Sequence, residues 1–434
     1  MMPRAGLEVP LHIPARYMLV AVLSLLGWIV MAPWMITETI AAPLSYPVIS
    51  WVHLLTVGCI GSMILGASIQ LVPVALQVPF PAARIAGWSW FLWIIGLVIF
   101  EIGFSREVLS LLVPGATLLG IVLLLYALAI TQMVRTAPHR DAVAWHLLAA
   151  SWFAVIGFGI GWMLALTNVN GVLGGRMLPI LGAHIICMIV GWVVLTLLGV
   201  SYKLIGMFTL AERQLNQRRA LASGILIASG TLVIVAGILL ASPRWPITLA
   251  TLLISVGVVL AILEIARMYR KRMRKAIDVH MPFAIVALTG LNVSALLLVI
   301  ISLEDIPLAS NLTITAIWLV LTGAIIVAIQ GFFYKISTFL IWLRTYAPLA
   351  GKGPVPQLDQ MYRKNLAYIG LGAWLFSVIA IALSMVEILP LWSWWCAGLW
   401  IGGVLWCFNV VRISRHWFGP RPQISATPQP RSAH

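Results

Sequence analysis

One short motif occurs three times along the chain at nearly equal spacing. Its copies occupy residues 66–73, 199–206 and 331–338, and each copy begins with glycine near the end of an apolar run. The spacings are 199 − 66 = 133 and 331 − 199 = 132 residues. A regular internal repeat restricts the fold to one that uses the same group of elements three times.

A second marker keeps the same period. His12, His146 and His280 each open an apolar run, with spacings of 146 − 12 = 134 and 280 − 146 = 134 residues. Two independent markers at one period predict an internal triplication. The predicted repeats cover about residues 12–140, 141–275 and 276–415. We expect the three histidines to lie at the cytoplasmic membrane surface and to face lipid headgroups.

The apolar runs between these markers are long enough to cross a membrane. The chain is 62% hydrophobic and only 9% charged, which is typical of an integral membrane protein. A helix of about 20 apolar residues spans the hydrocarbon core of a bilayer. Twelve such runs are found, so each repeat holds four predicted helices and the fold class is all-α. The predicted spans are approximately 16–41, 47–76, 85–104, 107–133, 142–168, 178–208, 220–242, 246–269, 280–303, 311–343, 367–388 and 391–411.

The distribution of basic residues predicts the orientation. Only Arg106, Arg176 and Arg244 lie on one side of the predicted membrane, whereas the tails and the loops of the other side hold 27 − 3 = 24 of the lysines and arginines. Cytoplasmic loops carry the excess of positive charge, so we expect both termini to be cytoplasmic, in a bacterial inner membrane. Topology also accounts for the net charge of +15. No nucleic-acid partner is expected; the partner that this composition implies is membrane lipid.

The domain prediction is a single membrane domain over residues 1–415. Residues 416–434 are rich in proline and serine, which is typical of a disordered segment, here a cytoplasmic tail.

Two histidines lie near the outer ends of predicted spans. They are His53 in run 47–76 and His184 in run 178–208. Ionisable residues are rare inside membranes, so each one is a candidate functional residue. The structural alternative is that they serve as hydrogen-bond partners between helices. We therefore take His53 and His184 as the candidate cofactor-binding residues.

Twelve helices, three-fold repetition, cytoplasmic ends and outer-side histidines resemble subunit I of the heme-copper oxidase superfamily, which includes cytochrome c oxidases and nitric oxide reductases. The resemblance implies three arcs of four helices, with metal ligands on the second, sixth, seventh and tenth. It also implies that His53 corresponds to a ligand of the low-spin heme and His184 to a ligand of the copper or second iron.

The sequence departs from this family at most other ligand positions. His184 is followed by Ile-Ile-Cys-Met instead of the family's motif, and residues 220–242 contain no histidine. Alignment on Gly331 places Ala316 and Trp318 where the family has two histidines. We expect no conventional copper centre and no terminal oxidase activity, and we expect Trp318 to fill heme space in one arc. A b-type heme on His53 remains, with methionine, a second histidine or an open position opposite.

A second resemblance involves residues 199–209. This segment is similar to the end of a helix in NnrS-type membrane proteins, which have twelve spans, contain heme and copper, and are associated with nitric oxide stress. Gly206 stands where that pattern has proline. The resemblance implies a connection to nitric oxide.

Two classes of function follow. The first is a heme-binding membrane subunit with a role in redox chemistry, electron transport, or the handling of nitric oxide or oxygen. Its partners would be other respiratory or redox membrane subunits or a cytochrome. The second is a cofactor-free scaffold or anchor subunit of a respiratory complex. A transporter is a further alternative, since an arc emptied of heme encloses a pore.

Overall fold

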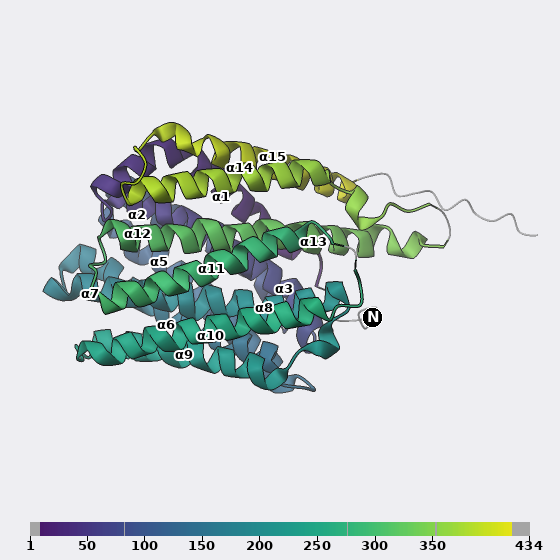
Figure 1. Cartoon of the computed structure of the whole chain (residues 1–434), viewed down its shortest axis with the longest axis horizontal. Coiled ribbons are helices and arrows are strands. Elements are labelled where there is room, and N and C mark those ends of the chain that lie inside the picture. The colour runs from purple at the N-terminus through teal and green to yellow at the C-terminus, as the bar shows by residue number, and fades with distance from the viewer. Residues whose placement is uncertain (1–8, 82, 276, 352–353, 419–434) are drawn as a thin grey trace, which may run out of the picture.

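The computed structural model describes residues 9–81, 83–275, 277–351 and 354–418. In this part of the chain, 12 helical spans are long and apolar enough to cross a membrane. They run side by side along the long axis of the molecule (Figure 1). The α-helical segments are α1 (His12–Ala41), α2 (Tyr46–His53), α3 (Ser62–Leu76), α4 (Ala83–Ser105), α5 (Leu112–Thr136), α6 (Ala142–Asn170), α7 (Met177–Ile186), α8 (Leu195–Thr209), α9 (Gln217–Leu239), α10 (Arg244–Arg270), α11 (His280–Leu303), α12 (Asn311–Trp318), α13 (Ile326–Thr345), α14 (Lys364–Met385) and α15 (Ala397–Phe418).

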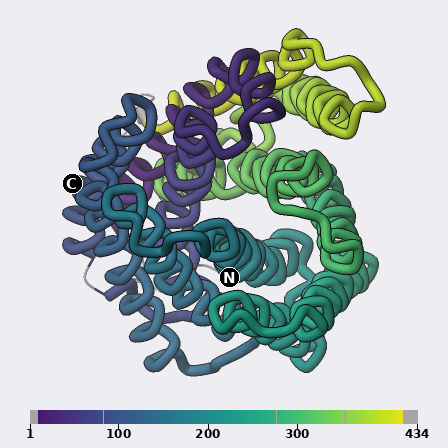
Figure 2. Tube along the Cα trace, turned by 90° about the vertical axis from the view of Figure 1, so that its left-hand side faces the viewer, coloured from purple at the N-terminus to yellow at the C-terminus, as the bar shows by residue number. Residues whose placement is uncertain are grey.

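The number of spans, the helical class and the arrangement in three arcs agree with the sequence prediction. The chain circles through the arcs in order, and the last helix returns to the first, because α15 packs against α1 (Figure 2). Helix α15 continues to Phe418, beyond the predicted start of the tail. The rest of the predicted tail, 419–434, lies outside the described residues.

Three spans contain a π-helical segment near the middle. These segments are η1 (Leu54–Gly61), η4 (Cys187–Val194) and η6 (Leu319–Ile325), which join α2 to α3, α7 to α8 and α12 to α13. The same three spans are the most buried of those described: 72%, 56% and 72% of an 18-residue stretch is buried, against at most 50% elsewhere. The second span of every arc is therefore the inner one. Because π-helical turns are rare and concentrate at functional sites, these segments direct attention to the residues beside them.

The glycine that opens each motif copy lies where two helices cross. At that point the inner span of each arc touches the first turns of the first span of the same arc. An added side chain would collide at Gly66 with the carbonyl oxygen of Pro14 (2.9 Å), at Gly199 with Cβ of His146 (2.8 Å) and at Gly331 with Cβ of Phe283. The motif therefore recurs because each arc needs a residue without a side chain at this crossing.

The prediction for the histidine marker was wrong in two of three places. His12 is exposed, but the side chains of His146 and His280 are only 1% and 2% exposed. The side chain of His146 fits between two glycines, since an added Cβ would lie 2.8 Å from Cβ of His146 at Gly199 and 2.6 Å from its Cε1 at Gly224. Small residues on the neighbouring helices thus draw this histidine into the bundle and away from headgroups.

Candidate functional site

His53 and His184 come together although 184 − 53 = 131 residues separate them. His53 is the last residue of α2, and His184 lies in the last turn of α7, so each precedes a π-helical segment. Their ring centres are 6.4 Å apart, and the ring planes differ by 25°. Two imidazoles on opposite sides of one metal ion, each with a metal–nitrogen bond of about 2.0–2.1 Å, have ring centres about 6 Å apart. The spacing therefore suits one ion between the rings.

Both imidazoles are oriented by a backbone carbonyl. Nδ1 of His53 lies 2.8 Å from the carbonyl oxygen of Ile49, and Nδ1 of His184 lies 2.8 Å from that of Gly157 on α6. A carbonyl oxygen only accepts hydrogen bonds, so each Nδ1 must carry the proton. Each Nε2 then keeps a lone pair. Histidines that ligate metals are held by the same kind of contact.

A glycine and two phenylalanines shape the space around the pair. An added Cβ at Gly161 of α6 would lie 2.7 Å from Cε1 of His184, so this ring occupies space that only glycine leaves. On the other side, Phe100 packs edge-on against His53 at 5.3 Å, and Phe104 stacks on it at 5.7 Å. These rings cover part of His53, which is half-buried.

The two histidines line one cavity of about 260 Å³, and most of its other lining residues are apolar. Pockets for organic ligands usually measure about 300–1,000 Å³. His53 and His184 would be the residues that hold a heme in this cavity, and a porphyrin ring would require some of the lining side chains to rotate. A single ion or a small apolar molecule needs no such change.

Trp318 lies in a cluster of four indole rings. This agrees with the expectation that its side chain fills space. Trp28 stacks on Trp51 at 4.7 Å and on Trp318 at 5.8 Å, and Trp374 lies 6.5 Å away. Each of the three partners donates its indole hydrogen to a backbone carbonyl: Trp51 to Trp28, Trp318 to Val378 and Trp374 to Thr322. This cluster joins α1, α2, α12 and α14. It leaves no imidazole at the position where the resemblance placed one.

The copper position of the resemblance has no set of ligands. Within the described residues, no group of three or more His, Cys, Asp or Glu side chains could hold a metal ion. Helix α9 contributes no histidine, and Cys187 is occupied by a hydrogen bond to the carbonyl oxygen of Phe153 at 3.3 Å. His184 lies beside His53, with ring centres 6.4 Å apart.

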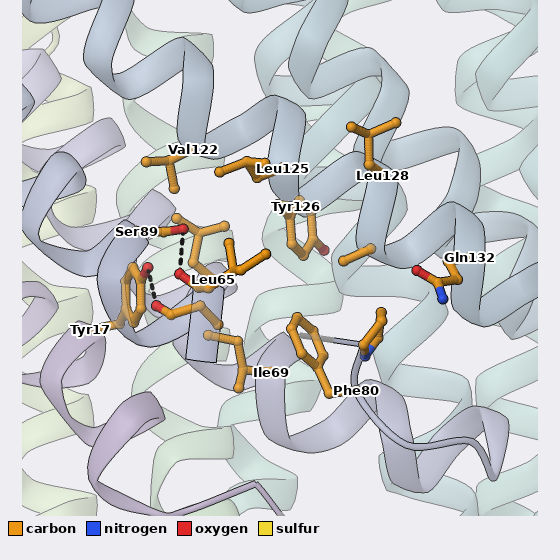
Figure 3. Close-up of a pocket in the computed structure, with 14 residues that line it drawn as sticks. Tyr17, Leu65, Ile69, Phe80, Ser89, Val122, Leu125, Tyr126, Leu128 and Gln132 are labelled. Carbon is orange, nitrogen blue, oxygen red and sulfur yellow. Dashed lines mark hydrogen bonds between the residues drawn. The ribbon is translucent and has the colours of Figure 1, made fainter. Parts of the chain in front are cut away.

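A further cavity, of about 190 Å³, lies between α1, α3, α4 and α5 (Figure 3). Its hydroxyl groups are hydrogen-bonded within the bundle: Tyr17 donates to the carbonyl oxygen of Ala86 at 3.2 Å, and Ser89 donates to that of Ile85 at 2.8 Å. The lining of this cavity includes no His, Cys, Asp or Glu side chain, so it is not the candidate site.

Sequence reasoning missed several parts of the histidine site. The π-helical segments and Gly161 have no sequence signal that distinguishes them from other small or apolar residues in the spans. Glu101 is closer to the site than its place near the end of a span suggested. Its Oε2 accepts a hydrogen bond from Ser50 at 2.6 Å, and its Oε1 is buried without a partner among the described residues. Ser50 precedes His53 by three residues, a spacing that puts both on one helix face.

Comparison with known proteins identifies the fold. No family profile and no curated protein matches the sequence. Among solved structures, a heme-copper terminal oxidase dimer determined by cryo-EM matches with a TM-score of 0.68 at 11% identity, over 96% of this chain and 85% of that one. The chain therefore has the fold of the heme-copper oxidase subunit I superfamily, with twelve membrane-spanning helices in three arcs.

Proposed function

We propose that the protein binds one b-type heme between His53 and His184 and transfers electrons within the membrane, without a copper centre. The observation that carries this proposal is the pair of neighbouring imidazoles, with each Nδ1 held by a carbonyl oxygen and the ring centres 6.4 Å apart. A bound heme supplies one-electron redox chemistry. The chain itself holds the two ligands, fixes their tautomers and covers part of His53 with Phe100 and Phe104.

Two imidazole ligands favour electron transfer over the binding of a gas. If both histidines held the heme, the chain would leave no ligand position for oxygen or nitric oxide. The nitric-oxide and oxygen roles belong to the variant of the proposal in which only one of the two histidines would hold it. The electron partner would be another respiratory or redox membrane subunit or a cytochrome, in a bacterial inner membrane.

A pyridine hemochrome spectrum of the purified chain tests the proposal. We expect a Soret band and about one heme b per chain. His53→Ala and His184→Ala should each abolish or strongly shift this band. The control is His139→Ala, because His139 is exposed in a loop. Colourless wild-type protein, or a band that both variants leave unchanged, would contradict the heme site. Carbon monoxide binding by the wild type would contradict only the form of the proposal in which both histidines hold the heme.

The tryptophan cluster supports a second candidate, a cofactor-free membrane scaffold. Indoles pack where the resemblance expects a ligand of one heme, and a fully packed interior needs no cofactor. This candidate predicts colourless protein that co-purifies with other respiratory subunits. The same spectrum, combined with gentle purification from the native membrane, separates the two candidates.

A further inference from the structure

A second large cavity lies between the second and third arcs. It measures about 520 Å³, twice the volume of the histidine cavity, and is enclosed by α7, α9, α10, α11 and α12 with the adjoining π-helical segments. Its lining comes from the starts of α7, α10 and α12 and the ends of α9 and α11. It therefore occupies the end of the bundle at which these helices begin or end (Figure 1).

The interior of this cavity is aliphatic. Isoleucine, valine and leucine side chains dominate its lining, and no His, Cys, Met or aromatic residue is among the lining residues. The hydroxyl groups within it are paired with their own helices: Thr251 donates to the carbonyl oxygen of Thr248 at 2.8 Å, and Ser294 donates to that of Gly290 at 2.9 Å. This lining offers no nitrogen or sulfur ligand for a heme iron, and water inside it would find few partners.

The mouth of the cavity is polar and charged. Arg244 forms an ion pair with Asp305, and these side chains are 71% and 56% exposed. Just inside, Ser302 donates a hydrogen bond to the hydroxyl group of Thr248 at 3.1 Å. Charged groups at the rim and hydrocarbon side chains within are complementary to a molecule with a polar head and an apolar chain.

We propose that this cavity binds the hydrocarbon chain of one membrane lipid, whose polar head lies at the Arg244–Asp305 rim. The dispersion contacts that an empty aliphatic cavity forfeits are restored when a hydrocarbon chain fills it. The chain could be the acyl chain of a phospholipid or the isoprenoid chain of a quinone, since the lining recognises hydrocarbon in both. Ile185, Ile189 and Ile317 line this cavity and the histidine cavity, so the bound chain would reach the wall of the candidate heme site. The proposal does not require heme.

The first test is lipid retention by the full chain after extensive washing in detergent. We expect extraction and mass spectrometry to find about one lipid per protein molecule, because one cavity holds one hydrocarbon chain. An ester-linked acyl lipid or a prenylated quinone identifies the source. Ser294→Phe fills the cavity from α11 and should lose the retained lipid. The matched control is Val293→Phe, because Val293 is 42% exposed on the outer face of the same helix.

A second measurement keeps the proposal testable if Ser294→Phe does not fold. Stearic acid labelled with a nitroxide near its terminal methyl should give a strongly immobilised electron paramagnetic resonance component with the wild-type protein. Arg244→Gln should weaken binding of this probe, because its carboxylate loses the rim cation. No retained lipid and no immobilised component in the wild type, or equal retention by the two phenylalanine variants, would overturn the proposal. The Soret band is read separately, so failure here does not bear on the heme site.

Discussion

At the scale of single residues, the candidate site depends on what is missing as much as on what is present. His184 of α7 reaches the cavity only because Gly161 of α6 has no side chain. A carbonyl oxygen of α6, that of Gly157, also fixes the tautomer of His184. His53 needs no such space because its carbonyl partner, Ile49, lies one turn back on its own helix. The positions of the two histidines are therefore differently sensitive to substitutions in neighbouring helices.

Gly161→Ala should disable the site. The added Cβ would lie 2.7 Å from Cε1 of His184, so the ring must move away from His53. We expect the Soret band to shift or disappear, and the folded state to lose about 1–3 kcal/mol from overpacking. Gly159→Ala is the control, because nothing lies within 4 Å of its added Cβ. Alanine there should leave the spectrum unchanged and raise helix stability slightly. Both effects can be followed by absorbance during thermal unfolding; equal behaviour of the two variants would contradict the role of Gly161.

A buried ion pair at the other end of the bundle makes a second residue-scale prediction. Lys335 is 6% exposed; its Nζ lies 2.5 Å from Oδ2 of Asp278 and 4.8 Å from the ring centre of Phe208. Burial by itself would raise the pKa of Asp278, but the hydrogen bond and charge of Lys335 outweigh it and lower this pKa. A lowered folded-state pKa means that the contribution to stability is present above the unfolded value, about 3.9, and is lost as the pH falls through the folded value.

Lys335→Met should therefore destabilise the protein by about 1–3 kcal/mol at neutral pH. The difference in stability between wild type and Lys335→Met should shrink as the pH falls towards 3, because without Lys335 the pKa of Asp278 is no longer lowered and protonation of this carboxyl no longer costs stability. The melting temperature measured between pH 3 and pH 8 checks both effects. Lys364→Met is the control, because its ion pair with Asp359 is 48% and 38% exposed and exposed pairs contribute little. Parallel curves for wild type and Lys335→Met would refute the coupling.

At the scale of elements, the three inner spans share one design. Each has a π-helical segment in the middle and a glycine crossing nearer the end. The residue just before each π-helical segment has different contacts. His53 pairs with His184, Ile186 lines the aliphatic cavity, and Trp318 belongs to the indole cluster. One backbone plan thus supports three interiors that differ in side chains alone.

Gly331→Ala tests the glycine crossing in the third arc. The added Cβ would overlap Cβ of Phe283 on α11, and neither α11 nor α13 can move without disturbing its other neighbours. We expect a loss of about 1–3 kcal/mol, measured as loss of helical circular dichroism during titration with sodium dodecyl sulfate. Gly372→Ala on α14 is the control, since nothing lies within 4 Å of its added Cβ. Unchanged stability of Gly331→Ala would show that the crossing tolerates a side chain.

At the scale of the whole molecule, the three arcs share one helical plan but differ in the side chains of their interiors. One cavity is lined by the two imidazoles on one side and by the indoles of Trp28, Trp51 and Trp318 on another, and a second cavity is aliphatic. A membrane bundle tolerates such exchange because lipid-facing surfaces and helix crossings maintain the fold, and interior side chains need only fill the space. Fold and chemistry are therefore separable in this architecture.

The orientation of the whole bundle remains a prediction, and cysteine labelling tests it. Gly175 and Arg213 are exposed at connections on opposite ends of the bundle. With the termini cytoplasmic, a membrane-impermeant maleimide should label Gly175→Cys in intact cells and Arg213→Cys only after permeabilisation, as the positive-inside rule requires. Three of the four native cysteines are buried, which limits background labelling. The reverse labelling pattern would show that the termini lie on the opposite side of the membrane.

The sequence by itself determined the number of spans, their approximate ends and the arrangement in three arcs. These features follow from local hydrophobicity, which a bilayer reads one span at a time, and from spacings along the chain. It also identified His53 and His184 as the candidates and Trp318 as a residue that fills space, because these depend on residue type and position alone.

Only the tertiary structure decided which of these residues meet. The pairing of His53 with His184, the space left by Gly161, the π-helical segments and the burial of His146 and His280 arise from contacts between helices far apart in sequence. Such contacts depend on how side chains interlock across a helix interface, and hydropathy and spacing contain no information about that interlocking.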